Sequence, residues 1–182
     1  VKGRQAAQYM AETMIDFYTE PGRYSADWKG LERLVLNGNT AIHDWGTDQL
    51  TGRPQGGCAG SICWIHQDRM MICHAGDTMV YLIRDGRIKS LTRSHQAQDG
   101  ALLRYFGFGP GLRPDLNEIR IEESDRILLV SDGVTKILPA AVSIYKEIEH
   151  LSDLCQCVRH LVNRSLRKGS GDDITAMMIE IE

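Results

Sequence analysis

The sequence contains no long apolar run and no strongly basic segment. No stretch of its 182 residues is apolar for long enough to cross a bilayer. The 21 basic and 24 acidic residues nearly balance, giving a formal net charge of −3, and no basic stripe stands out. We therefore expect neither a membrane nor a nucleic acid among the partners of this protein.

Disulfide, zinc and thiol-nucleophile patterns are also missing. The five cysteines follow no disulfide or zinc spacing, and Cys58 has no accompanying His and Asp motif to activate it. Cys63 and Cys73 lie in apolar runs, where a free cysteine behaves as a small hydrophobic residue. We interpret all five as reduced, structural thiols of a cytoplasmic protein. The six histidines show no ligand spacing either, and we assign His74 and His95 packing or hydrogen-bonding roles.

What the sequence does contain is a clear order of helical and strand patterns. Apolar residues recur at helical spacing in the first part of the chain, where Asp27 is the expected cap of the second helix. Asp85-Gly86 between two strand-like runs is a strong signal for a tight hairpin, and Gln67-Asp68 is a second hairpin loop. Helices are predicted over 7–17, 28–42, 139–148 and 152–166, and strands over 61–66, 70–75, 80–84, 87–91, 117–121, 126–131 and 174–181. This order predicts an α+β fold in which helices cover antiparallel strands.

Three aspartates share one setting at the ends of predicted strands. Asp77 and Asp132 directly follow strands, Asp172 precedes the last strand, and each has a glycine within two residues. Carboxylates grouped on a rigid sheet can hold Mg²⁺ or Mn²⁺, which prefer oxygen ligands. Each aspartate alone fits an ordinary turn residue equally well, because Asp next to Gly commonly forms an Asx turn.

Four segments in the correct order resemble the metal-dependent protein serine/threonine phosphatases of the protein phosphatase 2C (PPM-type) family. The family motifs Gly-Asp-Ser-Arg, Leu-Thr-x-Asp-His, Gly-Asp-x-Leu-Leu-Leu-x-Ser-Asp-Gly and Gly-Ser-x-Asp-Asn-x-Thr have approximate counterparts here. These are Met71-Ile-Cys-His-Ala-Gly-Asp-Thr78, Leu91-Thr-Arg-Ser-His95, Ser124-Asp-Arg-Ile-Leu-Leu-Val-Ser-Asp-Gly133 and Gly169-Ser-Gly-Asp-Asp-Ile-Thr175. The resemblance implies two antiparallel sheets packed as a sandwich with a helix pair on each outer face (α-β-β-α).

By position, the resemblance assigns roles to the aspartates. Asp132 and Asp172 match metal ligands of the two-metal centre, and Asp77 matches the aspartate that bacterial members use for a third ion. Gly133 and Asp173 flank these ligands, and Asp173 is expected to support them. The implied cofactors are Mn²⁺ or Mg²⁺, and no catalytic residue beyond the metal ligands is expected in this chain.

The chain also departs from the family pattern. Thr78 and Met79 replace Ser-Arg, Ser94 replaces an Asp, and the segment from Leu91 to Phe106 is short. The first family strands, with a phosphate-binding Arg, an acidic pair and an Asp-Gly-x-Gly-Gly loop, have no counterpart. We therefore expect residues 1–182 to form a single phosphatase-like domain that lacks its first strands and first metal-binding loop, with little or no activity by itself.

Three functional hypotheses follow from this resemblance. The first is a protein phosphatase that hydrolyses phosphoserine and phosphothreonine by a metal-activated water and works against a cognate Ser/Thr kinase. The second is a catalytically inactive phosphatase-like module that binds or regulates a phosphoprotein. The third keeps the chemistry of the first and differs in substrate, which would be a small regulator protein in stress signalling.

Overall fold

The computed structural model describes residues 2–20 and 27–182. These residues form two compact units, which are described one by one. The first comprises residues 1–63, 71–76 and 95–116, and the second comprises 64–70, 77–94 and 117–182. The expectation of a single domain over residues 1–182 stays a prediction.

The first unit contains two helices, α1 (Lys2–Thr19) and α2 (Trp28–Gly46), which pack against each other. Asp27 caps α2 as predicted, since its carboxylate accepts a hydrogen bond from the Gly30 amide at 2.8 Å. The apolar stripe of α2, including Leu31 and Val35, is buried. No helix among the described residues has the length and apolar character that a membrane span requires.

A three-stranded sheet has the order β1-β2-β5, with β1 (Gly60–His66), β2 (Arg69–Ala75) and β5 (Asp115–Arg120). The imidazole of His74, on β2, lies 2.9 Å from the hydroxyl of Ser61, and the Gly76 amide donates to Nδ1 of His95 at 3.2 Å. Both histidines are buried, so their predicted packing and hydrogen-bonding roles are confirmed.

The cysteines behave as structural thiols. All five are free, and burial raises the pKa of Cys58 to about 11 and that of Cys63 and Cys73 to about 12. At neutral pH these three thiols are therefore protonated, which makes them poor nucleophiles.

The second unit is built on a four-stranded antiparallel sheet of order β4-β3-β6-β7. Its strands are β3 (Met79–Arg84), β4 (Arg87–Ser90), β6 (Arg126–Val130) and β7 (Ala176–Glu180). The β3–β4 turn has positive φ at both Asp85 (50°) and Gly86 (69°), as the predicted tight hairpin requires.

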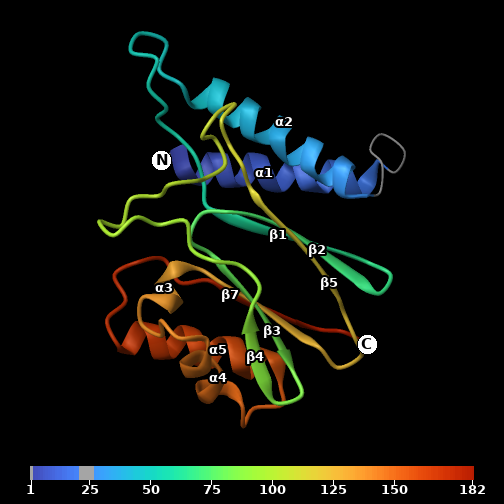
Figure 1. The fold of residues 1–182 in the computed structure, drawn as a ribbon. Helices are drawn as coiled ribbons and strands as arrows, with labels where there is room; N and C mark the ends of the chain where they lie inside the picture. The colour runs from blue at the N-terminus through green and yellow to red at the C-terminus, as the bar shows by residue number, and fades with distance from the viewer. Residues whose placement is uncertain (1, 21–26) are drawn as a thin grey trace. The chain divides into compact units, whose positions relative to one another are not determined.

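Three helices cover one face of this sheet: α3 (Asp132–Thr135), α4 (Ala141–Ile148) and α5 (Leu154–Arg167) (Figure 1). Their apolar residues Ile144 and Leu161 join the strand residues Tyr81 and Leu128 in one buried core. The prediction of an α+β fold with two antiparallel sheets and helices is confirmed. The short helix α3 was not predicted, because four residues are too few to show helical periodicity.

Candidate metal centre

The strand register of the four-stranded sheet brings the three predicted aspartates to one end. Val130, the last residue of β6, pairs with Met79 at the start of β3 and with Ala176 at the start of β7. Asp132 follows β6, whereas Asp77 precedes β3 and Asp172 precedes β7. Antiparallel pairing therefore makes three segments that are far apart in the sequence leave the sheet at the same edge.

Hydrogen bonds then hold two of these segments together. The Ser131 hydroxyl donates to the Asp173 carbonyl at 3.0 Å and accepts from the Thr175 amide at 2.9 Å. The Ser131 amide donates to the Thr175 carbonyl at 3.0 Å, and the Ser170 hydroxyl donates to the Gly133 carbonyl at 2.9 Å. The backbones on either side of Asp132 and Asp172 are thus fixed to each other independently of the carboxylates.

Gly133 allows this approach because it has no side chain. A Cβ at this position would lie 2.6 Å from the Asp173 carbonyl oxygen and 3.0 Å from Cγ1 of Ile174. Gly133 and Asp173 therefore contact each other next to Asp132 and Asp172, and Asp173 contributes its backbone carbonyl; their supporting role stays a prediction.

The side chains of Asp132 and Asp172 converge on one cation, the ammonium group of Lys136. Lys136 Nζ lies 2.6 Å from Oδ2 of Asp132 and 2.6 Å from Oδ2 of Asp172. The two carboxylate oxygens are consequently no farther apart than twice that distance. Hydrogen bonds to Asp132 and then to Asp172 raise the pKa of Lys136, so the ammonium is firmly protonated.

Asp77 belongs to the same electrostatic environment. Burial raises the pKa of Asp77, the negative charge of Asp132 raises it further, and Asp172 adds a smaller effect of the same sign. Lys136 acts in the opposite direction. Asp77 therefore lies within the electrostatic influence of Asp132, Asp172 and Lys136.

The side chains at this end are of the type that binds a hard divalent cation, and the ammonium of Lys136 contacts two of them. Carboxylate oxygens are the ligands that Mg²⁺ and Mn²⁺ prefer. Among residues 2–20 and 27–182, however, no group of three His, Cys, Asp or Glu side chains is assembled for a metal. The site as it stands is a pair of carboxylates bridged by an ammonium group, with Asp77 nearby.

Lys136, Ser131 and Ser170 are site residues that the sequence reasoning missed. Lys136 follows Asp132 by four residues, which is the spacing of an ion pair on a helix, so the sequence could have indicated the contact between Lys136 and Asp132. Nothing in the sequence indicates the second contact, because Asp172 is distant in the chain.

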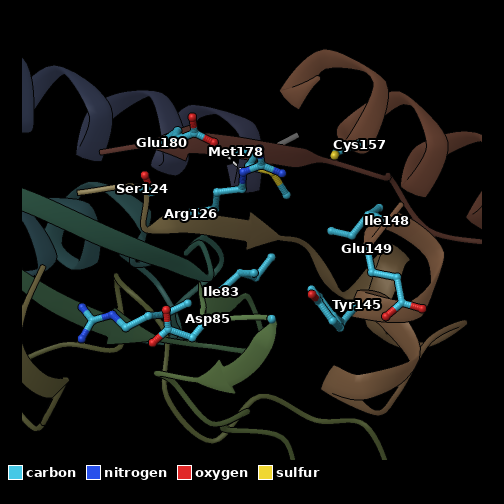
Figure 2. Close-up of a pocket in the computed structure, with 12 residues that line it drawn as sticks. Ile83, Asp85, Ser124, Arg126, Tyr145, Ile148, Glu149, Cys157, Met178 and Glu180 are labelled. Carbon is cyan, nitrogen blue, oxygen red and sulfur yellow. Dashed lines mark hydrogen bonds and ion pairs between the residues drawn. The ribbon is translucent and has the colours of Figure 1, made fainter. Parts of the chain in front are cut away.

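A cavity lies at the opposite end of the same sheet, where Arg126 pairs with Ile83 and Glu180 across the strands (Figure 2). It has a volume of about 300 Å³ and is also lined by Tyr145 of α4 and Cys157 of α5. Arg126 forms an ion pair with Glu180 and donates to backbone carbonyls of the α4–α5 connection, so its charge is already satisfied. This cavity is not part of the aspartate site.

Solved structures of PPM-type protein phosphatases have this fold. The catalytic domain of the serine/threonine protein phosphatase PstP, in complex with two manganese ions, superposes with a TM-score of 0.80 at 23% identity, over 98% of this chain and 81% of that chain. The family described as Stage II sporulation protein E (SpoIIE) matches residues 2–182, and the chain belongs to this family.

Two curated proteins that are similar to this chain are named as protein phosphatases. PstP of Mycobacterium tuberculosis (strain H37Rv) is 23% identical over 132 residues, which cover 63% of this chain and 25% of that protein. The probable protein phosphatase 2C 69 of Arabidopsis thaliana is 23% identical over 210 residues, which cover 97% of this chain and 58% of that protein. The matched part of the chain thus spans 25% of the length of the first relative and 58% of the length of the second.

Proposed function

We propose that the protein is a serine/threonine phosphatase and that this chain supplies part of its metal centre. The observation that carries the proposal is the convergence of the Asp132 and Asp172 carboxylates on a single cation at one end of a rigid sheet. The relatives named as serine/threonine phosphatases and the manganese-bound PstP domain support the same function.

In this function Asp132 and Asp172 would hold a Mn²⁺ or Mg²⁺ ion, and Asp77 would contribute to a further ion. A bound ion of this kind lowers the pKa of a coordinated water from about 15.7 toward 7, which supplies hydroxide at neutral pH for attack on a phosphate. The chain's own contribution is to orient these carboxylates. Ser131 and Ser170 fix the two backbones, so the oxygen donors are in position before a cation arrives.

The partners follow from this chemistry. The substrate would be a phosphorylated protein, with a Ser/Thr kinase as the opposing enzyme. A cytoplasmic location fits the free thiols, which an oxidising compartment would tend to pair.

One observation favours a second candidate, a phosphatase-like module that binds or regulates without catalysis. The ammonium of Lys136 already bridges the two carboxylates and offsets part of their negative charge. If this lysine stayed in place permanently, the site would be structural.

The two candidates are separated by Asp132→Asn in the full-length protein that carries this chain. If the carboxylate is a metal ligand, Mn²⁺-dependent hydrolysis of a phosphoserine peptide should fall by more than about 100-fold, because even partners of metal ligands cost 10–100-fold when they are lost. Asp85→Asn is the matched control: it makes the same chemical change at the hairpin turn, where Asn tolerates positive φ. Equal rates for both variants would exclude the phosphatase mechanism.

A further inference from the structure

Among the ion pairs formed by residues 2–20 and 27–182, Lys136 is the one cationic residue that contacts both proposed metal ligands. Lys136 directly follows α3 and keeps helical backbone angles, so its side chain lies one turn beyond Asp132 on the same face. The same Nζ atom also reaches Asp172, which arrives from the segment before β7. One ammonium therefore occupies the space that both carboxylates face.

We propose that Lys136 is a tethered cation that occupies the position of a divalent ion between Asp132 and Asp172, so that metal binding is a displacement of its ammonium group. The inference rests on the proposed function for the identity of the metal ligands and goes beyond it in assigning a competitor. Its consequence is that Lys136 weakens metal affinity while stabilising the metal-free protein.

Electrostatics explains why a tethered cation is useful here. Carboxylates held together without a cation repel one another, and Asp132 and Asp172 each place an oxygen 2.6 Å from the same Nζ atom. A lysine ammonium removes part of this repulsion with a single positive charge. A divalent ion brings twice the charge and can coordinate both carboxylates directly, so it should prevail at sufficient concentration.

The geometry also allows the ammonium to leave. The side chains of Lys136 and Asp172 are each 48% exposed, and that of Asp132 is 24% exposed. Ion pairs at such exposed positions are weak, and a released lysine regains the freedom of its four-carbon stem in water. The carboxylates stay in place after release, because Ser131 and Ser170 hold their backbones.

The decisive variant is Lys136→Met, which removes the charge and keeps the length of the side chain. Mn²⁺ binding is measured on the metal-free protein by the decrease of the free-ion signal in electron paramagnetic resonance. We expect the dissociation constant for Mn²⁺ to fall about tenfold relative to wild type, the order of a partly exposed double ion pair. Lys136→Arg, which keeps the charge, should retain the weaker affinity of wild type.

Thermal unfolding gives a second readout that does not depend on activity. In EDTA, Lys136→Met should unfold at a lower temperature than wild type, because the carboxylates lose their only tethered cation in this contact. Saturating Mn²⁺ should remove that difference. Lys146 is an exposed lysine on α4 that lies away from the aspartates in the sequence. Lys146→Met is therefore the matched control and should change neither the Mn²⁺ dissociation constant nor the unfolding temperature.

Two results would overturn the inference. An unchanged or weaker Mn²⁺ affinity in Lys136→Met would show that the ammonium does not compete with the ion, even if the Asp132→Asn experiment supports the phosphatase. Absence of Mn²⁺ binding by both wild type and Lys136→Met would show that no ion takes this position. Failure of the phosphatase proposal alone would look different: tighter Mn²⁺ binding in Lys136→Met without any turnover in wild type.

Discussion

Gly133→Ala tests whether the close approach of two backbones creates the site. Gly133 follows Asp132 directly, and its backbone passes next to the carbonyl of Asp173. An added methyl group would lie 2.6 Å from that oxygen, whereas real Cβ contacts are essentially never shorter than 3.0 Å. The two segments must therefore separate by at least about 0.4 Å, and by more if ordinary van der Waals contact is restored.

The separation has a structural and a functional cost. Forcing an extra methyl group into a packed contact costs about 1–3 kcal/mol, and the nearest atom here is the backbone oxygen of Asp173, which cannot rotate away. The hydrogen bonds from Ser131 to Asp173 and from Ser170 to Gly133 span this same gap, so they should lengthen together. Because the carboxylates of Asp132 and Asp172 move with their backbones, we expect Mn²⁺ affinity to fall about tenfold or more.

Urea denaturation of the metal-free protein measures the loss of stability in Gly133→Ala, and the Mn²⁺ titration measures the loss of Mn²⁺ affinity. Gly171→Ala is the matched control, since a Cβ at Gly171 would meet nothing within 4 Å. Gly171→Ala should match wild type in both assays. If Gly133→Ala also matched wild type in stability and in Mn²⁺ affinity, the reasoning that this glycine sets the separation of the carboxylates would be refuted.

Two further predictions concern the stability of the second unit. Asp125 is 1% exposed and pairs with Arg84 at 2.6 Å, so Asp125→Asn should cost about 3 kcal/mol at pH 7 in urea titrations. The Arg84 hydrogen bond holds the pKa of Asp125 below its usual value of 3.8, so this stabilisation is present above about pH 4. This stabilisation is lost as the pH falls through the lowered pKa of Asp125. The difference in unfolding free energy between wild type and Asp125→Asn should therefore become smaller in acid, and an unchanged difference would contradict this account. Asp153 caps α5 through the Gln156 amide at 2.6 Å, and Asp153→Ala should cost about 1 kcal/mol in the same assay. Unchanged stability would mean that this cap contributes nothing.

Local sequence signals predicted the local structure well. Asp85-Gly86 and Gln67-Asp68 were predicted as hairpin loops, and Asp85, Gly86 and Gln67 all have positive φ. Asp27 was predicted as a helix cap and forms the expected hydrogen bond. In each case the determinant lies within a few residues of the feature, so a short window of sequence contains the physical cause.

The convergence of Asp132 and Asp172 was predictable from the sequence, but the other contacts of the site were not, and the role of these aspartates as metal ligands stays a prediction. Asp132 and Asp172 were singled out by position, and the structure brings them to one cation. The Lys136 bridge to Asp172 depends on the register of β6 against β7 and on the hydrogen bonds of Ser131, which no local pattern encodes. The three-ligand metal centre suggested by the resemblance stays a prediction, because the described residues bring two carboxylates to one ammonium and assemble no group of three metal-binding side chains.

The ion pairs at the two ends of the four-stranded sheet differ in burial, and this difference indicates at which end one cation can be replaced by another. At one end Arg84 binds Asp125, whose carboxylate is almost fully buried. Removing the Arg84 cation would leave this carboxylate charged, unpaired and out of contact with water. At the other end Lys136 binds carboxylates that remain accessible to solvent, and their positions are set by backbone contacts of Ser131 and not by the ammonium. A cation can be replaced without unfolding only where it does not itself hold the structure together. The aspartate end meets that condition and the Arg84 end does not, so a cation bound at the aspartate end can be replaced without unfolding the sheet.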